Sequence, residues 1–148
     1  MNILFFLKPK QQVIYIYDDY TIRQAMEKME FHRYTSIPII NHEGDYVGTL
    51  SEGDILFEIK NHQDFSLKKS EDIKISDINR LRDNNPIDVN AAIDDLILKA
   101  TTQNFVPVVD DRNKFIGIVT RKDIITYFLK KNTNFDIENN EMNKNEIN

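Results

Sequence analysis

An internal repeat constrains the fold of this chain more than any other feature of its sequence. Residues 37–40 and 46–55 recur as residues 106–109 and 115–124, each at an offset of 69 positions. Further upstream the match continues at an offset of 67, so the second copy carries two extra residues in a segment that suits a loop. Self-similarity on this scale indicates two copies of one supersecondary unit.

Each copy has the pattern of strand, helix, strand, hairpin, strand and helix. Residues 13–17 form a run of β-branched and aromatic side chains, which favours a strand, and residues 22–29 carry apolar side chains at helical spacing. Residues 37–40 and 46–50 are short apolar strands, joined by a polar loop of hairpin length that contains glycine. Ser51 then suits the N-cap of a second helix. The sequence therefore predicts an α+β fold of two βαββα repeats.

The patterns also predict the boundaries of the parts. The parts are an N-terminal extension with the first repeat (1–62), a linker (63–75), the second repeat (76–131) and a tail (132–148). We expect Ser76 to cap a single helical turn and Leu81 to lie in a strand. The apolar residues 3–7 are expected to pack on the module or on a dimer mate. The tail holds seven Asn among its 17 residues and few large apolar groups, so we expect it to be disordered.

Composition narrows the setting and the partners. The 148 residues include no cysteine, which removes disulfides and thiolate metal sites and fits a cytoplasmic location. A net charge of -5 argues against a dedicated DNA or RNA binder, because such proteins neutralise phosphates with Lys and Arg. The apolar run near the start is too short for a membrane span, so we expect no membrane partner.

Enzymatic and metal chemistry lack the required side chains. There is no nucleophile beside a base, no cluster of metal ligands and no Gly-rich phosphate loop. His32, His42 and His62 stand apart from other ligands at metal-binding spacing, so we expect them to be structural or solvent-facing. We therefore expect a non-enzymatic protein with no metal and no cofactor.

The repeated motifs resemble those of a tandem CBS (cystathionine β-synthase) domain pair, or Bateman module. The motifs are a strand proline between apolar residues, at Pro38 and Pro107, and a Gly-apolar-apolar-Ser/Thr-x-x-Asp start of the last helix, at 48–54 and 117–123. The resemblance covers residues from about 10 to 131. It implies two βαββα repeats packed about a pseudo-twofold axis, with two equivalent clefts built across the repeats. Modules of this kind usually dimerise, so a homodimer is expected.

We expect the primary cleft at the start of the last helix. A helix N-terminus and the hydroxyl of Thr120 favour phosphate, and Arg121 and Lys122 add positive charge. The resemblance gives Asp123 the role of binding a ribose and gives the adenine a wall on the first repeat. The candidate residues of this cleft are Ile14, Tyr34, Thr35, Ser36, Ile37, Pro38, Thr120, Arg121, Lys122 and Asp123. Thr120 and Asp123 could equally be the N-cap and a first-turn acid of an ordinary helix, and this interpretation stays open.

The secondary cleft should bind more weakly. Glu52 and Gly53 stand where the primary cleft has Arg121 and Lys122, and an acid beside a phosphate is unfavourable unless Arg80 or Arg82 reaches in. Its candidate residues are Ser51, Asp54, Arg80, Leu81, Asn104, Phe105 and Val106.

The resemblance implies a ligand-sensing regulatory module that signals to a partner protein, whose identity stays open. The ligand would be an adenine nucleotide: AMP, ADP, ATP or cyclic di-AMP. Residues 34–38 and 120–122 are similar to those of small CBS proteins that bind cyclic di-AMP, although Asp123 departs from that pattern. The alternative is a ligand-free dimeric interaction scaffold. The sequence leaves both functions open.

Overall fold

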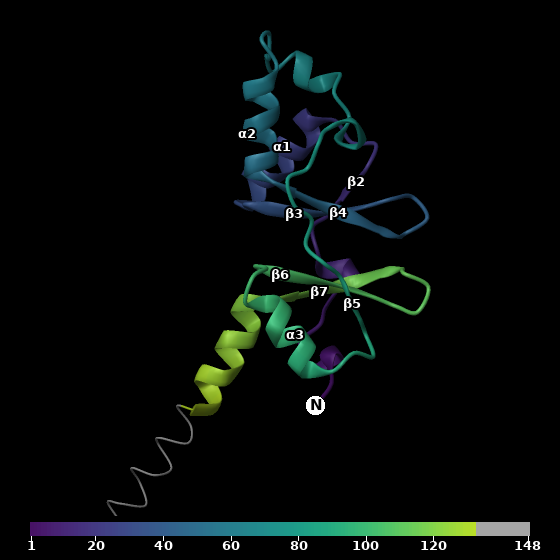
Figure 1. The fold of residues 1–148 in the computed structure, drawn as a ribbon, viewed down its shortest axis with the longest axis vertical. Coiled ribbons are helices and arrows are strands. Elements are labelled where there is room, and N and C mark those ends of the chain that lie inside the picture. Colours follow the sequence, from purple (N-terminus) through teal and green to yellow (C-terminus); the bar gives the residue numbers. More distant parts are fainter. Residues whose placement is uncertain (133–148) are drawn as a thin grey trace, which may run out of the picture.

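Two small β-sheets face each other, and each carries its helices on its outer side (Figure 1). The computed structural model describes residues 1–132. The predicted tail lies outside the described residues from residue 133 onward. Three apolar clusters hold the described part together, one in each repeat and one between the two sheets.

The first repeat has the predicted order of elements. Strand β2 (Ile16–Tyr17) runs parallel to β3 (Ser36–Ile40), which pairs antiparallel with β4 (Tyr46–Ser51). Helix α1 (Ile22–His32) connects β2 to β3, and α2 (Glu52–Asn61) follows β4. Only the end of the predicted first strand pairs, because the chain reaches the edge of β3 at Ile16.

The second repeat copies this arrangement, but its first strand and helix start 71 residues after Ile16 and Ile22, so the expected offset of 67 with two extra residues is wrong. Strand β5 (Ile87–Asp88) is parallel to β6 (Phe105–Val109), which pairs antiparallel with β7 (Phe115–Thr120). Helix α3 (Ile93–Ala100) connects β5 to β6, and a helix over residues 121–132 follows β7. The predicted α+β fold of two βαββα repeats is confirmed.

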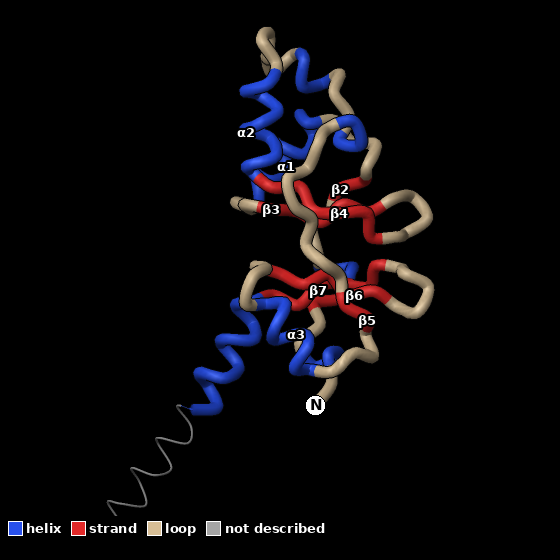
Figure 2. Tube along the Cα trace, in the orientation of Figure 1, coloured by secondary structure: helices blue, strands red, loops and turns tan. Residues whose placement is uncertain are grey.

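Contacts between equivalent positions mark the pseudo-twofold axis. Tyr46 and Phe115 occupy the same place in the two repeats, and their rings stack at a centroid distance of 6.3 Å. Asp45 and Lys114 are likewise equivalent, and the Lys114 Nζ atom lies 2.8 Å from Asp45 Oδ1. A residue touches its own equivalent only at a twofold axis, so the axis passes between these pairs. The two hairpins that carry them lie side by side in Figure 2.

The N-terminal segment packs on the second repeat, although it precedes the first in sequence. It contains the short 3-10 helix η1 (Ile3–Phe5), strand β1 (Lys8–Pro9) and the 3-10 helix η2 (Lys10–Gln12). Strand β1 pairs antiparallel with β7, which gives the sheet the order β1-β7-β6-β5. Ile3 and Phe6 are buried in the core of that repeat.

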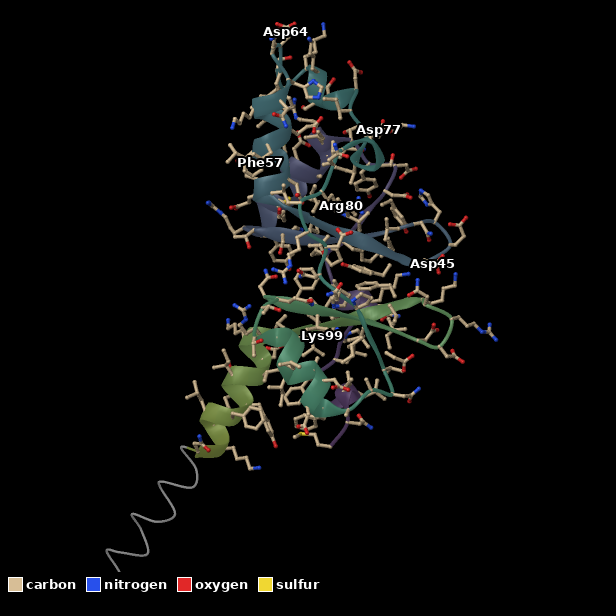
Figure 3. All side chains as sticks on the ribbon, viewed as in Figure 1. Asp45, Phe57, Asp64, Asp77, Arg80 and Lys99 are labelled. Carbon is tan, nitrogen blue, oxygen red and sulfur yellow. The ribbon has the colours of Figure 1, made fainter. Side chains whose placement is uncertain are left out.

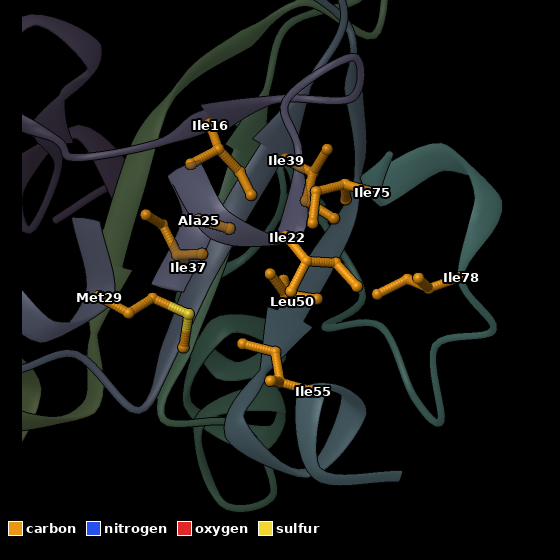
Figure 4. Close-up of a cluster of buried hydrophobic side chains, with 10 residues drawn as sticks. All are labelled: Ile16, Ile22, Ala25, Met29, Ile37, Ile39, Leu50, Ile55, Ile75 and Ile78. Carbon is orange, nitrogen blue, oxygen red and sulfur yellow. The ribbon is translucent and has the colours of Figure 1, made fainter. Parts of the chain in front are cut away.

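The core of the first repeat takes two residues from the connector between the repeats. Figure 4 shows Ile75 and Ile78 beside Ile22 of α1. The connector contains the 3-10 helices η3 (Lys69–Glu71) and η4 (Ile75–Asp77). The helical turn expected near Ser76 is therefore present, although Ser76 does not cap it.

The strand expected around Leu81 is wrong. Leu81 is exposed and lies outside every described strand, and pairing with β6 starts only at Ile87. The physical reason is that the Leu81 amide donates to the Asp54 carboxylate, at 2.7 Å, and so has no proton left for a strand ladder. Of the residues that follow it, Asp83 accepts from the Thr49 amide and Asn84 accepts from the Tyr46 hydroxyl, both in the first repeat.

Candidate functional site

A cavity of about 460 Å³ lies between the two repeats, on the side where the last helix begins. It is built from both repeats and from the N-terminal segment, so it exists only in the assembled module. Its lining residues are Lys8, Val13, Ile14, Arg33, Tyr34, Thr35, Ser36, Pro38, Asn104, Phe105, Ile118, Thr120, Lys122 and Asp123.

Three cations from three different elements line this cavity. Lys8 comes from β1, Arg33 from the C-terminal cap of α1, and Lys122 from the first turn of the last helix. Among the described residues, none of the three side chains is paired with a carboxylate. Unpaired cations gathered in one cavity of an acidic protein form a local site for an anion.

The start of the last helix supplies one free acceptor. The Thr120 hydroxyl oxygen accepts from the Asp123 amide at 3.1 Å, as an N-cap does. The Asp123 carboxylate is exposed and has no hydrogen-bond partner among the described residues. An ionised carboxylate accepts hydrogen bonds only, so Asp123 can receive the hydroxyl groups of a ligand.

The remaining walls are mostly apolar. Val13, Pro38, Phe105 and Ile118 are buried, and Ile14 is half-buried. A cavity with apolar walls and a few charged groups at one side suits a ligand that has a flat apolar part and an anionic part.

A protein-family model matches both repeats. The CBS domain model matches residues 7–61 and again residues 75–130. The chain belongs to the CBS domain family. Its two matches coincide with the two structural repeats, so each βαββα unit is one CBS domain.

The solved structures most similar to this chain are tandem CBS proteins. CbpB in complex with c-di-AMP has a TM-score of 0.82 at 26% identity and covers 93% of this chain and 91% of its own. CbpB from Streptococcus agalactiae has a TM-score of 0.76 at 27% identity, over 90% of this chain and 83% of its own. CBSX2 in complex with AMP, at 22% identity and a TM-score of 0.69 over 88% of this chain and 98% of its own, shows the fold alone.

Several curated relatives are longer proteins. Inosine-5'-monophosphate dehydrogenase of Bacillus subtilis is 31% identical over 137 residues, which is 90% of this chain but 24% of that enzyme. The same enzyme of Methanocaldococcus jannaschii is 27% identical over 115 residues, with 78% of this chain and 21% of the enzyme covered. The likeness to these enzymes is confined to the CBS repeats.

The cavity brings together most of the residues expected in the primary cleft. Eight of them line it: Ile14, Tyr34, Thr35, Ser36, Pro38, Thr120, Lys122 and Asp123. Two do not. Ile37 is fully buried in the core of the first CBS domain, because alternate residues of a strand face opposite sides. Arg121 Nε donates to the Ala100 carbonyl at 2.7 Å, which holds this side chain against the C-terminal end of α3.

Sequence reasoning missed several lining residues. Lys8, Val13, Arg33 and Ile118 were not expected. Ile118 lies inside the repeated motif and was detectable from it, whereas nothing in the sequence around Lys8 indicates that β1 joins the second sheet. Asn104 and Phe105 were expected in the secondary cleft, but they line the primary cavity.

At the secondary cleft, Asp54 is already bonded within the protein. It is 1% exposed, its Oδ2 accepts from the Ser51 amide at 2.9 Å, and its Oδ1 accepts from the Leu81 amide at 2.7 Å. Arg80 is paired with Asp83, at 2.8 Å between Nε and Oδ1. Val106, also expected here, lies in the core of the second CBS domain.

Residues 1–132 lack two further features. No helix there is long and apolar enough to cross a membrane. The same residues contain no group of three His, Cys, Asp or Glu side chains that could hold a metal ion.

Proposed function

We propose that this chain is a regulatory module that binds an adenine nucleotide in the primary cleft and signals the bound state to a partner protein. The observation that carries the proposal is the coincidence, in one cavity, of three unpaired cations with the free carboxylate of Asp123. The role of the site is binding, because the cavity offers no nucleophile with an adjacent base.

Each part of a nucleotide has a counterpart in the cavity. Lys8, Arg33 and Lys122 bind phosphate, through charge-assisted hydrogen bonds of about 1.5–3 kcal/mol each. Asp123 accepts from ribose hydroxyls, and Ile118 contributes to the apolar wall against the base. Cations on three separate walls favour a ligand with more than one phosphate, such as ADP, ATP or cyclic di-AMP. The similarity to CbpB, solved with c-di-AMP, supports cyclic di-AMP as the first ligand to test.

A second cavity provides a route for the signal. About 390 Å³ in volume, it lies between α1 and α2, and Arg33 and Tyr34 line both cavities. Arg33 has a left-handed backbone conformation, with φ of 59°, at the end of α1. A ligand that holds Arg33 and Tyr34 in one arrangement shifts the population of the neighbouring helix surface toward the state that a partner recognises.

Exposed apolar side chains on the outer helices suit a homodimer. Leu56 and Phe57 on α2 are exposed, and so is Ile125 on the last helix. Apolar side chains gathered on outer helices mark an interaction surface. In this proposal the dimer acts in the cytoplasm, where a protein without cysteine loses nothing to the reducing conditions.

Calorimetry and melting with AMP, ADP, ATP, cyclic di-AMP and cyclic di-GMP test the nucleotide proposal. At about 100 times its dissociation constant, a true ligand raises the free energy of unfolding by ~2.7 kcal/mol. Asp123→Ala should weaken binding by roughly ten- to a hundredfold, since it removes hydrogen bonds to a charged group. Asp95→Ala, which removes an exposed carboxylate from α3, is the matched control and should have no effect.

The alternative function has a distinct outcome in the same experiment. If no nucleotide shifts the melting temperature and none releases or takes up heat, the ligand-free dimeric scaffold replaces the sensor. If a nucleotide binds equally well to wild type and Asp123→Ala, binding occurs but the assigned site is wrong.

A further inference from the structure

The connector between the repeats bonds the equivalents of two residues that line the primary cavity: Asp54 corresponds to Asp123, and Thr49 corresponds to Ile118. Figure 2 shows it crossing from the first repeat to the second in front of the edges of both sheets, and Arg80 is labelled on it in Figure 3. Leu81, Asp83 and Asn84 of the connector are each hydrogen-bonded to the first repeat. The Leu81 amide donates to Asp54 Oδ1 (2.7 Å), the Thr49 amide donates to Asp83 Oδ1 (2.9 Å), and the Tyr46 hydroxyl donates to the Asn84 carbonyl (2.6 Å).

The second repeat holds the same segment from the other side. Gln103, only 4% exposed, accepts from the Asn85 amide at 2.9 Å and donates to the Asn85 carbonyl at 3.0 Å. The Asn84 side chain donates to the Phe105 carbonyl at 3.1 Å. Residues 80–85 therefore bridge the two repeats, as a ligand in the primary cleft would.

The segment also satisfies the charges of the secondary cleft. Arg80, the cation expected to reach a phosphate here, forms a two-contact pair with Asp83, at 2.8 Å and 3.2 Å. Burial alone would raise the pKa of Asp83, but the hydrogen bonds from Arg80 and from the Thr49 amide outweigh it and lower the pKa. Both groups are thus held in their charged, paired forms.

Differences between the repeats explain why only one cleft is filled in this way. Tyr46 and Thr49, whose hydroxyl groups bond Asn84 of the connector, have Phe115 and Ile118 as their equivalents, and neither of those offers a hydroxyl group. Ile118 instead forms apolar wall in the primary cavity. Gly48 also makes room for the connector, because a Cβ atom at this position would lie 2.5 Å from Asp83 Oδ1. The first repeat is therefore built to receive residues 80–84.

We propose that residues 80–84 are a permanent intramolecular occupant of the second cleft, so that the chain binds one nucleotide and Asp54 serves the connector instead of a ligand. This inference rests on the proposed function for its count of ligands. Its structural part is that the connector stays docked. Docking in the nucleotide-free protein can be tested without any ligand.

Hydrogen exchange of the Leu81 and Thr49 amides tests the docking directly. Both amides should be protected in the nucleotide-free protein and equally protected at saturating cyclic di-AMP. Asp83→Ala should speed their exchange by at least about tenfold, because it removes a hydrogen bond to a charged acceptor. Asp77→Ala, an exposed carboxylate on the same connector, is the control and should leave both rates unchanged. Fast exchange in the wild-type protein, or loss of Leu81 protection on saturation, overturns the proposal.

The number of nucleotides bound per chain, measured by calorimetry, tests the claim that only one cleft takes a ligand. Wild type should bind one cyclic di-AMP or ATP per chain, and Asp123→Ala should leave no second, residual site. Two molecules per chain would overturn the permanent occupant while leaving the proposed function intact. If wild type binds none, the proposed function fails, and the docked connector then stands or falls on the exchange of the Leu81 amide.

Discussion

Asp54 and Asp123 occupy the same position in the two repeats, yet their surroundings give them opposite roles. Asp54 is buried and its carboxylate accepts from two backbone amides, whereas the carboxylate of Asp123 is exposed and has no hydrogen-bond partner among the described residues. The difference arises from what packs against each helix start: the connector at the first, and the open cavity at the second. Asp54 thus has a structural role, whereas its equivalent Asp123 is a candidate ligand contact.

Alanine substitutions should separate these two roles. Asp54→Ala leaves the Ser51 and Leu81 amides without their acceptor, so we expect the free energy of unfolding to fall by about 1.5–3 kcal/mol. Asp123→Ala should leave stability nearly unchanged, because surface substitutions away from such contacts rarely matter. Urea denaturation of both variants measures this. Equal losses would contradict the assignment of different roles.

The paired carboxylate of Asp83 should contribute to stability against acid. Its pKa in the folded protein is lower than the ordinary 3.8, so the folded state binds fewer protons than the unfolded state. The stabilisation is complete above that ordinary value and is lost as the pH falls through the lower folded value. Asp83→Asn should therefore flatten the loss of stability below about pH 4. Unfolding measured between neutral and acidic pH, with Asp77→Asn as control, checks this; an unchanged acid slope would count against the Arg80–Asp83 pair.

At the scale of elements, β1 depends on a glycine in its partner strand. Gly117 has φ of 155°, and a Cβ atom there would overlap the carbonyl of Lys8. Gly117→Ala should displace β1 and cost about 1–3 kcal/mol of stability. It should also weaken nucleotide binding, because Lys8 lines the cavity. Gly53→Ala is the matched control, since a Cβ atom there meets only ordinary contacts, and melting and calorimetry of both variants provide the comparison.

Elements that are defined by a side-chain pattern could be predicted from the sequence, whereas elements that are defined by backbone contacts could not. The strands and helices of both repeats have apolar residues at periodic spacing, and Ser51 and Thr120 cap their helices as expected. Strand β1 is a Lys-Pro dipeptide without such a pattern, and its pairing depends on a close approach to Gly117. The docked connector uses backbone amides and carbonyls from an irregular segment. Neither the pairing of β1 nor the docking of the connector requires a periodic pattern of side chains, so neither can be predicted from the sequence.

The candidate site was predictable to a similar extent. The motif placed Thr120, Lys122 and Asp123 at the cavity, because they follow directly from where the last helix begins. It did not place Arg121, whose long side chain turns to the Ala100 carbonyl. It assigned Asn104 to the secondary cleft, whereas Asn104 lines the primary cavity. Asn104 donates to the Ser36 hydroxyl across the two repeats, at 2.9 Å, and residues that close to the axis can line either cleft.

At the scale of the whole molecule, the exposed apolar side chains of the outer helices favour a partner surface. We expect a compact dimer, with a mass of twice 17.4 kDa by light scattering. Leu56→Asp combined with Ile125→Asp should yield a monomer, because charges would then be buried in the apolar interface. Leu67→Asp, on the exposed connector, is the control and should leave the dimer intact. A wild-type protein that is monomeric at micromolar concentration would contradict this.

The pairing of β1 with β7 has a consequence for how the protein is made. Lys8 leaves the ribosome long before its partner Ile118, because the whole first repeat is synthesised between them. The sheet of the second repeat cannot be completed during synthesis until almost all of the described chain is free, and contacts this distant in sequence form slowly. For the same reason a protease cut in the connector would not release two self-sufficient halves. The C-terminal half would lack its edge strand, and the N-terminal half would expose the apolar residues Ile3 and Phe6.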